Sequence, residues 1–147
     1  MALVDRHIND LLQGAKRLFS EIRQEINDHQ GLVHIQLSCL AQLSQTLIAS
    51  KNLTDFQILV ELVDQHFEPA NERLEKLNNA VYVSFFEYLY LDVENGDLAW
   101  AVMPSKLRTE YASFIAALEA DGPKKLDYMT NKQKFSQRQK RASRHQK

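Results

Sequence analysis

The sequence predicts an all-α fold, a single-domain bundle of five or six antiparallel helices. Its 147 residues include only 4 glycines and 3 prolines, too few for the many turns of an all-β chain. Apolar residues recur at spacings of three and four along the first 120 positions, which is the period of amphipathic helices. A chain of this length has room for one domain with a substantial core. Its helical hairpins could also stack like a short α-solenoid, although no repeat of fixed period is present.

Two helices are expected before residue 52. Residues 4–28 are predicted to form one long amphipathic helix, because apolar side chains from Val4 to Ile26 fall on one of its faces. Gly31 is its expected C-terminal break. A second helix is predicted over residues 32–50, where leucines supply most of the apolar face.

The third helix carries a start signal of its own. Thr54 and Gln57 fit a capping box, with Thr54 as the N-cap, and Leu53 and Ile58 hold the positions of a hydrophobic staple. Pro69 should end this helix, because proline disfavours α conformation in the residue before it. Proline also suits the first turn of a following helix.

That fourth helix is expected over about residues 70–93 and contains the run VYVSFFEYLYL, residues 81–91. The composition of the run would also suit a strand, but the absence of a partner strand elsewhere favours a buried central helix. One helix cannot turn all of these aromatic side chains toward one neighbour. Each is therefore either core or an outward-facing interface anchor. The candidate anchors are Tyr82, Tyr90 and Trp100.

Two more helices complete the predicted body. Asp97 is expected to cap a short helix, and Pro104 or Ser105 is expected to open the last one. Asp121-Gly122-Pro123 should end the domain. We therefore expect an acidic helical domain over residues 1–121 and a basic C-terminal tail, flexible or helical, over residues 122–147.

The net charge of −1 conceals an asymmetry between the two parts of the chain. Residues 1–120 have a balance of −8, whereas residues 121–147 have a balance of +7. Such an asymmetry bears on partners rather than on fold. The candidate partner-binding acids lie on the first helix and around Pro69: Glu21, Glu25, Asp28, Glu61, Asp64, Glu68, Glu72 and Glu75. The candidate basic contacts of the tail are Lys132, Lys134, Arg138, Lys140, Arg141, Arg144 and Lys147.

No motif of a catalytic or cofactor-binding site is present: no glycine-rich phosphate loop, G-x-S-x-G, HExxH or CxxC. Asp64 with His66 is the best candidate for acid–base chemistry, because a carboxylate can orient an imidazole. His66 also lies on the apolar stripe of its helix, where we expect a structural role. Cys39 sits in the apolar stretch LSCLAQL and is expected to be a small core residue. We therefore expect no enzyme activity, catalytic residue, metal or cofactor.

The cellular compartment can also be inferred. The N-terminal MALVDRHINDLL does not resemble a secretory signal, and no apolar run approaches the roughly 20 residues of a membrane span. The single cysteine excludes an internal disulfide framework. We expect a cytoplasmic protein without a membrane partner.

Residues of about 54–118 resemble a family of small, uncharacterised bacterial all-α proteins. The resemblance is carried by a helix ending in His66-Phe67, by NNAVYVSFFEYLYLD, which fits a core-helix pattern N-x-V-x-x-x-F-x-E-x-L, and by the proline-led MPSKLRTEYASF. Where the family usually has a Leu-Gly-Pro-like turn, this chain has Val102-Met103-Pro104. Members are often suspected to be immunity proteins of polymorphic toxin loci, so the resemblance implies no enzyme activity.

Two hypotheses of function follow. In the first, an immunity or antitoxin protein neutralises a partner toxin or effector domain, and its carboxylates occupy a basic cleft on that partner. In the second, a nucleic-acid-associated regulator contacts phosphates through the basic tail. Phe135 is the only aromatic residue among the last nineteen, which makes a poor stacking surface for a single strand. The tail could instead lie on the acidic body or extend a helix into a partner.

Overall fold

The chain is all-helical over residues 2–120, the range that a computed structural model describes. This range contains seven α-helices and no strand, so the predicted all-α bundle is confirmed. The predicted domain end at Asp121 and the predicted tail lie outside the described residues. The helices are α1 (Leu3–Leu18), α2 (Arg23–Asp28), α3 (Val33–Ala49), α4 (Leu53–His66), α5 (Glu75–Ala80), α6 (Gly96–Val102) and α7 (Ser105–Ala120).

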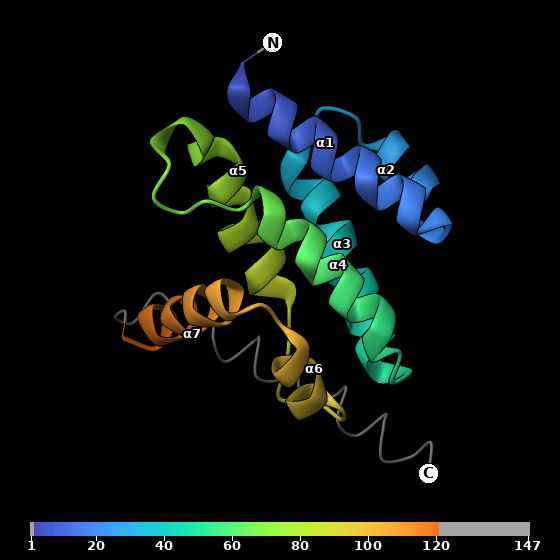
Figure 1. Cartoon of the computed structure of the whole chain (residues 1–147), viewed down its shortest axis with the longest axis vertical. Helices are drawn as coiled ribbons and strands as arrows, with labels where there is room; N and C mark the ends of the chain where they lie inside the picture. Colours follow the sequence, from blue (N-terminus) through green and yellow to red (C-terminus); the bar gives the residue numbers. More distant parts are fainter. Residues whose placement is uncertain (1, 121–147) are drawn as a thin grey trace.

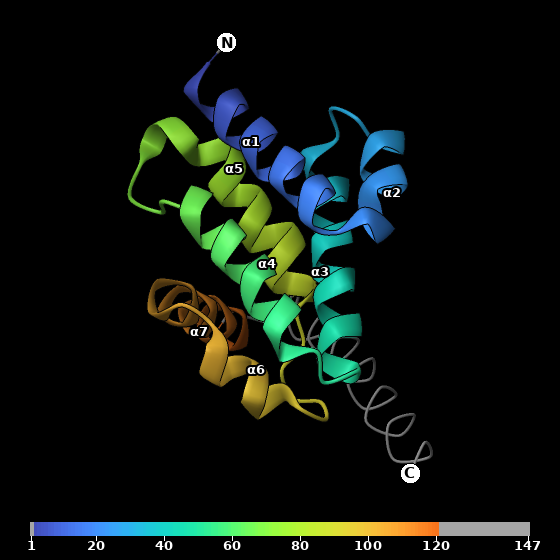
Figure 2. The same cartoon turned by 45° about the vertical axis from the view of Figure 1, so that its right-hand side comes forward.

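Helix α4 lies between two groups of helices (Figures 1 and 2). α1 packs along one side of it, with α2 beyond, whereas α6 and α7 pack on the other side. α3 forms a hairpin with α4 and also contacts α1, α2 and α5. The side chains of Leu37, Leu40 and Ile48 on α3 are fully buried. α3 and α4 therefore form the centre around which the other helices are arranged.

The predicted helix over residues 4–28 is broken into two. α1 ends before Phe19, and the 3-10 turn η1 (Ser20–Ile22) leads into α2. Phe19 leaves the helical conformation with φ −131° and ψ 88°, and its ring is buried. The guanidinium of Arg23 donates to the Lys16 carbonyl at 3.1 and 3.4 Å. This contact satisfies one of the acceptors that the end of α1 leaves free.

The N-cap of α4 is Asn52, so the prediction of Thr54 was wrong. Asn52 Oδ1 accepts from the Asp55 backbone N–H at 3.3 Å, and Asn52 Nδ2 donates to the Asp55 carboxylate at 2.8 Å. The first bond satisfies one backbone donor of the helix start, and the second, between the two side chains, holds the cap in place. Gln57 donates to Glu61 at 3.0 Å instead of reaching back.

Pro69 lies in a non-helical corner, so the predicted helix start at this proline was also wrong. The corner is organised by Asn78, whose buried amide donates to the Glu68 carbonyl at 2.8 Å and accepts from the Glu68 N–H at 3.3 Å. Asn71 then caps the 3-10 turn η2 (Glu72–Leu74) by accepting from a backbone N–H at 3.0 Å. These bonds replace the helix that the sequence pattern predicted.

The predicted helix over about residues 70–93 is interrupted after α5 by a π-helical turn. This turn, η3 (Val81–Phe85), is closed by a hydrogen bond from the Phe86 N–H to the Val81 carbonyl. A π turn holds one residue more than an α turn. The side chains of Phe85 and Phe86, at the end of this turn, are both fully buried. The 3-10 turn η4 (Phe86–Tyr88) then ends the helical segment.

The chain between η4 and α6 is fixed by polar contacts with α3. Gln45 donates to the Tyr90 carbonyl and accepts from the Tyr90 N–H, both at 2.9 Å. A Cβ on Gly96 would lie only 1.8 Å from the Leu91 carbonyl oxygen, so this position requires glycine. Asn95, with φ 67°, precedes α6 and donates to the Ile48 carbonyl at 3.0 Å. The predicted cap of α6 by Asp97 was therefore wrong.

Phe86 is the centre of an aromatic cluster that joins α4, η3 and α7. Its ring is fully buried and lies edge-on to Phe67 with ring centroids 5.7 Å apart. Edge-to-face pairs are favourable because the ring edge is positive and the ring face is negative. The other rings within 5.5–6.2 Å of Phe86 are Tyr82, Phe85, Tyr111 and Phe114.

Phe86→Ala should lower the free energy of unfolding by about 3–5 kcal/mol, because it leaves a cavity among these rings. Phe86→Leu should cost less and remain measurable if the alanine variant does not fold. Tyr88→Ala is the control, since Tyr88 lies in the same turn η4 but is 47% exposed, and should change stability by about 0.5 kcal/mol or less. Urea denaturation followed by circular dichroism measures all three. Equal losses for Phe86→Ala and Tyr88→Ala would contradict a central role for Phe86.

Candidate protein-binding surface

The first group of predicted acids lies beyond the C-terminal end of α1. Glu21 is in η1, and Glu25 and Asp28 are in α2; we call these three the α2 acids. All three are exposed. Asp28 accepts a hydrogen bond from Gln24 at 2.7 Å within its own helix. The α2 acids are therefore placed where a partner could reach them.

The second group, the corner acids, surrounds the turn between α4 and α5. Its members are Glu61, Asp64, Glu68, Glu72 and Glu75. Four of the five are exposed, and Asp64 is the exception. The Asp64 carboxylate lies 3.6 Å from Lys106 Nζ, and the same ammonium donates to the Asp64 backbone carbonyl at 2.9 Å. Asp64 thus links α4 to α7 within the chain.

The structure does not bring the two groups into one patch. The segment that holds η2 and α5 lies beside the N-terminal half of α1, whereas α2 lies at the other end (Figures 1 and 2). Opposite charges on a partner would therefore have to span the length of α1. Burial and His7 lower the pKa of His66, and Asp10 of α1, which is not among the selected acids, lies close enough to oppose part of this shift, as does Glu68.

Two histidines meet where α1 crosses the end of α4. His7 Nδ1 and His66 Nδ1 are 3.1 Å apart, and the rings are edge-on with centroids 5.3 Å apart. One Nδ1 must carry the hydrogen while the other accepts it. Burial is the main cause that lowers the pKa of His66, and His7 lowers it further. The candidate Asp64–His66 pair forms no hydrogen bond among the described residues, because His66 pairs with His7.

The three candidate aromatic anchors have different environments. Tyr82 packs against Phe114 and donates to the Glu110 carboxylate at 2.7 Å; burial and this carboxylate raise the pKa of Tyr82 to about 12. Tyr90 is half-buried beside Gln45. Trp100 is 36% exposed, with Arg108 6.0 Å above its ring. Trp100 is therefore the most accessible of the three.

Cys39 is buried on α3, where burial and the neighbouring Glu25 carboxylate raise the pKa of its thiol to about 11. A thiol with such a pKa is a poor nucleophile at neutral pH, because the thiolate is the reactive form. Within residues 2–120, no group of three or more His, Cys, Asp or Glu side chains could hold a metal ion.

Two further predictions concern the basic C-terminal tail and the membrane. The candidate basic contacts from Lys132 to Lys147 lie outside the described residues. None of the helices in the described range is long and apolar enough to cross a membrane.

Together these features define an all-helical domain with two exposed acidic groups. The chain belongs to a family described as a domain of unknown function, DUF7674, whose model matches residues 12–117. The expected membership of an uncharacterised family is confirmed to that extent, and the suspected role in toxin immunity stays a prediction. Searches of curated proteins and of solved structures gave no match.

The histidine pair makes a pH dependence of stability testable. The pKa of His66 is lower in the folded chain than its usual value of 6.5, so the unfolded chain binds a proton first as pH falls. Stability should therefore decrease as pH is lowered through about 6.5 and towards 5, measured by thermal unfolding.

His66→Gln should flatten this dependence. Gln65→Ala, an exposed neighbour on the same helix, should keep the wild-type slope. An unchanged slope in His66→Gln would show that the histidine pair does not cause the effect.

Proposed function

We propose that this chain is a non-enzymatic binding protein of the immunity or antitoxin type. It neutralises a partner toxin or effector domain through its acidic surface, and it acts in the cytoplasm. The observation that carries the proposal is the exposure of seven of the eight selected acids on a body whose net charge is −8. The suspected immunity role of the proteins that this chain resembles supports the same reading.

The physical argument concerns the partner's charge. A toxin that acts on nucleic acid has a basic cleft, because it must bind phosphates. Carboxylates that enter such a cleft block it, and their long-range field speeds the encounter of the two proteins. The α2 acids lie at one end of α1, and Glu72 and Glu75 lie in the short η2–α5 segment beside its other end, so the two groups could contact two separate basic sites on one partner.

The interior of the chain supports a binding role as well. Cys39 is buried, and the His7–His66 pair and the Asp64–Lys106 pair each connect two helices. These polar groups therefore have structural partners within the chain. A rigid scaffold of this kind preserves the relative positions of its surface acids, which limits the ordering cost of binding.

The first test is neutralisation. The partner is to be sought among proteins encoded beside this gene and among those retained by the tagged chain in its native host. Expression of that partner should stop growth, and co-expression of this chain should restore it. If no such partner is toxic, or if growth is not restored, the immunity proposal fails.

The second test concerns the acids. Glu21→Lys with Asp28→Lys, and separately Glu72→Lys with Glu75→Lys, should each lower the association rate constant about tenfold or more at low salt, because long-range attraction is lost. Raised salt should slow the wild-type chain in the same direction. Surface plasmon resonance measures both effects.

The matched control is Asp97→Lys with Glu119→Lys, which makes the same change in charge at two exposed acids outside both groups. A much smaller effect is expected from it. If all three double variants slow association equally, the total charge of the protein determines the association rate, and the positions of the two acidic groups do not. If none does and salt has no effect, the electrostatic part of the proposal is wrong.

A further inference from the structure

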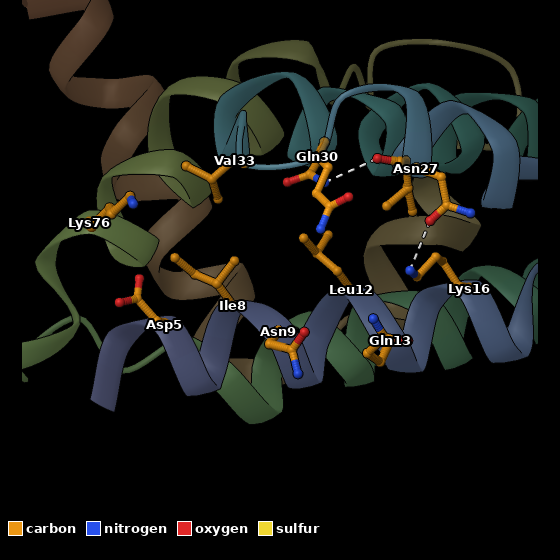
Figure 3. A pocket seen from close by; sticks show the side chains of 13 residues that line it. Asp5, Ile8, Asn9, Leu12, Gln13, Lys16, Asn27, Gln30, Val33 and Lys76 are labelled. Atoms are coloured by element: carbon orange, nitrogen blue, oxygen red, sulfur yellow. Dashed lines mark hydrogen bonds between the residues drawn. The ribbon is translucent and has the colours of Figure 1, made fainter. Parts of the chain in front are cut away.

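A pocket of about 230 Å³ lies between α1, the turn that joins α2 to α3, and α5 (Figure 3). Side chains from all three segments converge on it. Its apolar part is formed by residues that are wholly or largely buried beneath the opening. These residues are Ile8, Leu12, Ile26 and Val33.

The rim of the pocket consists mainly of carboxamides. Asn9 and Gln13 lie on α1, and Gln30 reaches across from the α2–α3 turn (Figure 3). All three side chains are exposed. A carboxamide offers both donor and acceptor groups, as a peptide group does.

Gln36 adds a polar group at the buried side of the pocket. It is 4% exposed, and its Nε2 donates to the Ile26 carbonyl at 3.1 Å. No hydrogen bond to its Oε1 is formed within the described part of the chain, and this oxygen is not fully buried, so it can accept from an N–H group that enters the pocket.

The charged residues of the lining do not form an open anion site. Lys16 Nζ donates to Asn27 Oδ1 at 2.9 Å at one end of the pocket. Asp5 and Lys76 lie at the other end (Figure 3), so the two lysines of the lining do not converge on one point. An apolar side chain flanked by neutral peptide groups suits this lining better than a phosphate or a carboxylate does.

The size of the pocket agrees with one such side chain. Sites for drug-sized molecules usually measure about 300–1,000 Å³, whereas a cavity of about 150 Å³ accepts benzene. We propose that this pocket receives one large apolar side chain of the partner protein, whose adjoining peptide groups bond with Asn9, Gln13, Gln30 and Gln36. The inference rests on the proposed function, because it assigns the pocket to the same partner.

The pocket is lined by residues that adjoin both acidic groups in the sequence. Lys76 follows Glu75 in α5, and Asn27 precedes Asp28 in α2, so the pocket's lining residues are sequence neighbours of both groups. The pocket therefore lies between the two segments that carry Glu75 and Asp28. Buried apolar anchors in such central pockets carry most of the binding energy of protein interfaces.

The test uses N-acetyl-L-leucinamide, which carries one apolar side chain between two peptide groups. Titrated into the ¹⁵N-labelled full chain, it should give saturable shifts of backbone amide signals around Asn9, Gln13, Gln30 and Gln36. The expected dissociation constant is on the order of millimolar for a ligand this small. N-acetylglycinamide, which lacks the side chain, should give no saturable shift.

Gln13→Ala with Gln30→Ala should raise the dissociation constant about fivefold or more, because two hydrogen bonds at the rim are lost. Gln42→Ala with Gln65→Ala is the matched control, since both glutamines are exposed and helical and lie outside the pocket lining. This control should bind the probe as the wild type does. Glu21→Lys with Asp28→Lys should bind the probe as the wild type does. This variant therefore distinguishes binding in the pocket from long-range attraction by the acids.

Three results would overturn the inference. The first is the absence of saturation by N-acetyl-L-leucinamide, and the second is equal binding of N-acetylglycinamide. The third is tighter binding of 4-methylpentanoate, which has the same apolar tail on a carboxylate and would indicate a site for small acids. Failure of growth rescue, with intact probe binding, would instead remove the toxin partner and leave a pocket for peptides.

Discussion

The burial of Phe86 among five other aromatic rings is the constraint on which the arrangement of the helices depends. The rings come from three parts of the chain: the end of α4, the π turn η3 and helix α7. The π turn η3 directly follows α5 and leads into Phe86, so the cluster fixes the end of the segment that begins with α5. α5 packs against α1 and its Lys76 lines one end of the pocket.

The sequence predicted correctly those helices whose ranges are determined by the spacing of apolar residues alone. α3 and α7 fall close to the predicted ranges, and Ser105 opens α7 as expected. The errors fall where a side chain bonds to backbone. Asn52 caps α4, Asn78 shapes the Pro69 corner, and Arg23 satisfies the end of α1. Such bonds compete with helical continuation and leave no periodic signal.

The candidate surface was predictable to a similar degree. Exposure of the α2 acids follows from their place on one flank of an amphipathic helix, and the structure shows all three exposed. The environments of Asp64 and Tyr82 could not be read from the sequence, because their partners, Lys106 and Glu110, lie 42 and 28 residues away. The pocket was missed for the same reason. Its lining combines α1, the α2–α3 turn and α5, which only the tertiary structure brings together.

An acidic surface and an anchor pocket solve different parts of the same recognition problem. Charge at long range raises the rate of encounter with any basic protein, and salt weakens it, so charge alone selects a partner poorly. A desolvated apolar contact is short-ranged and mainly slows dissociation. In this chain the carboxamide of Gln36 lies beside the apolar residues of the pocket, and its Oε1 can accept from an N–H that adjoins the entering side chain. Discrimination among basic partners would then arise at the pocket, after the acids have brought the two proteins together.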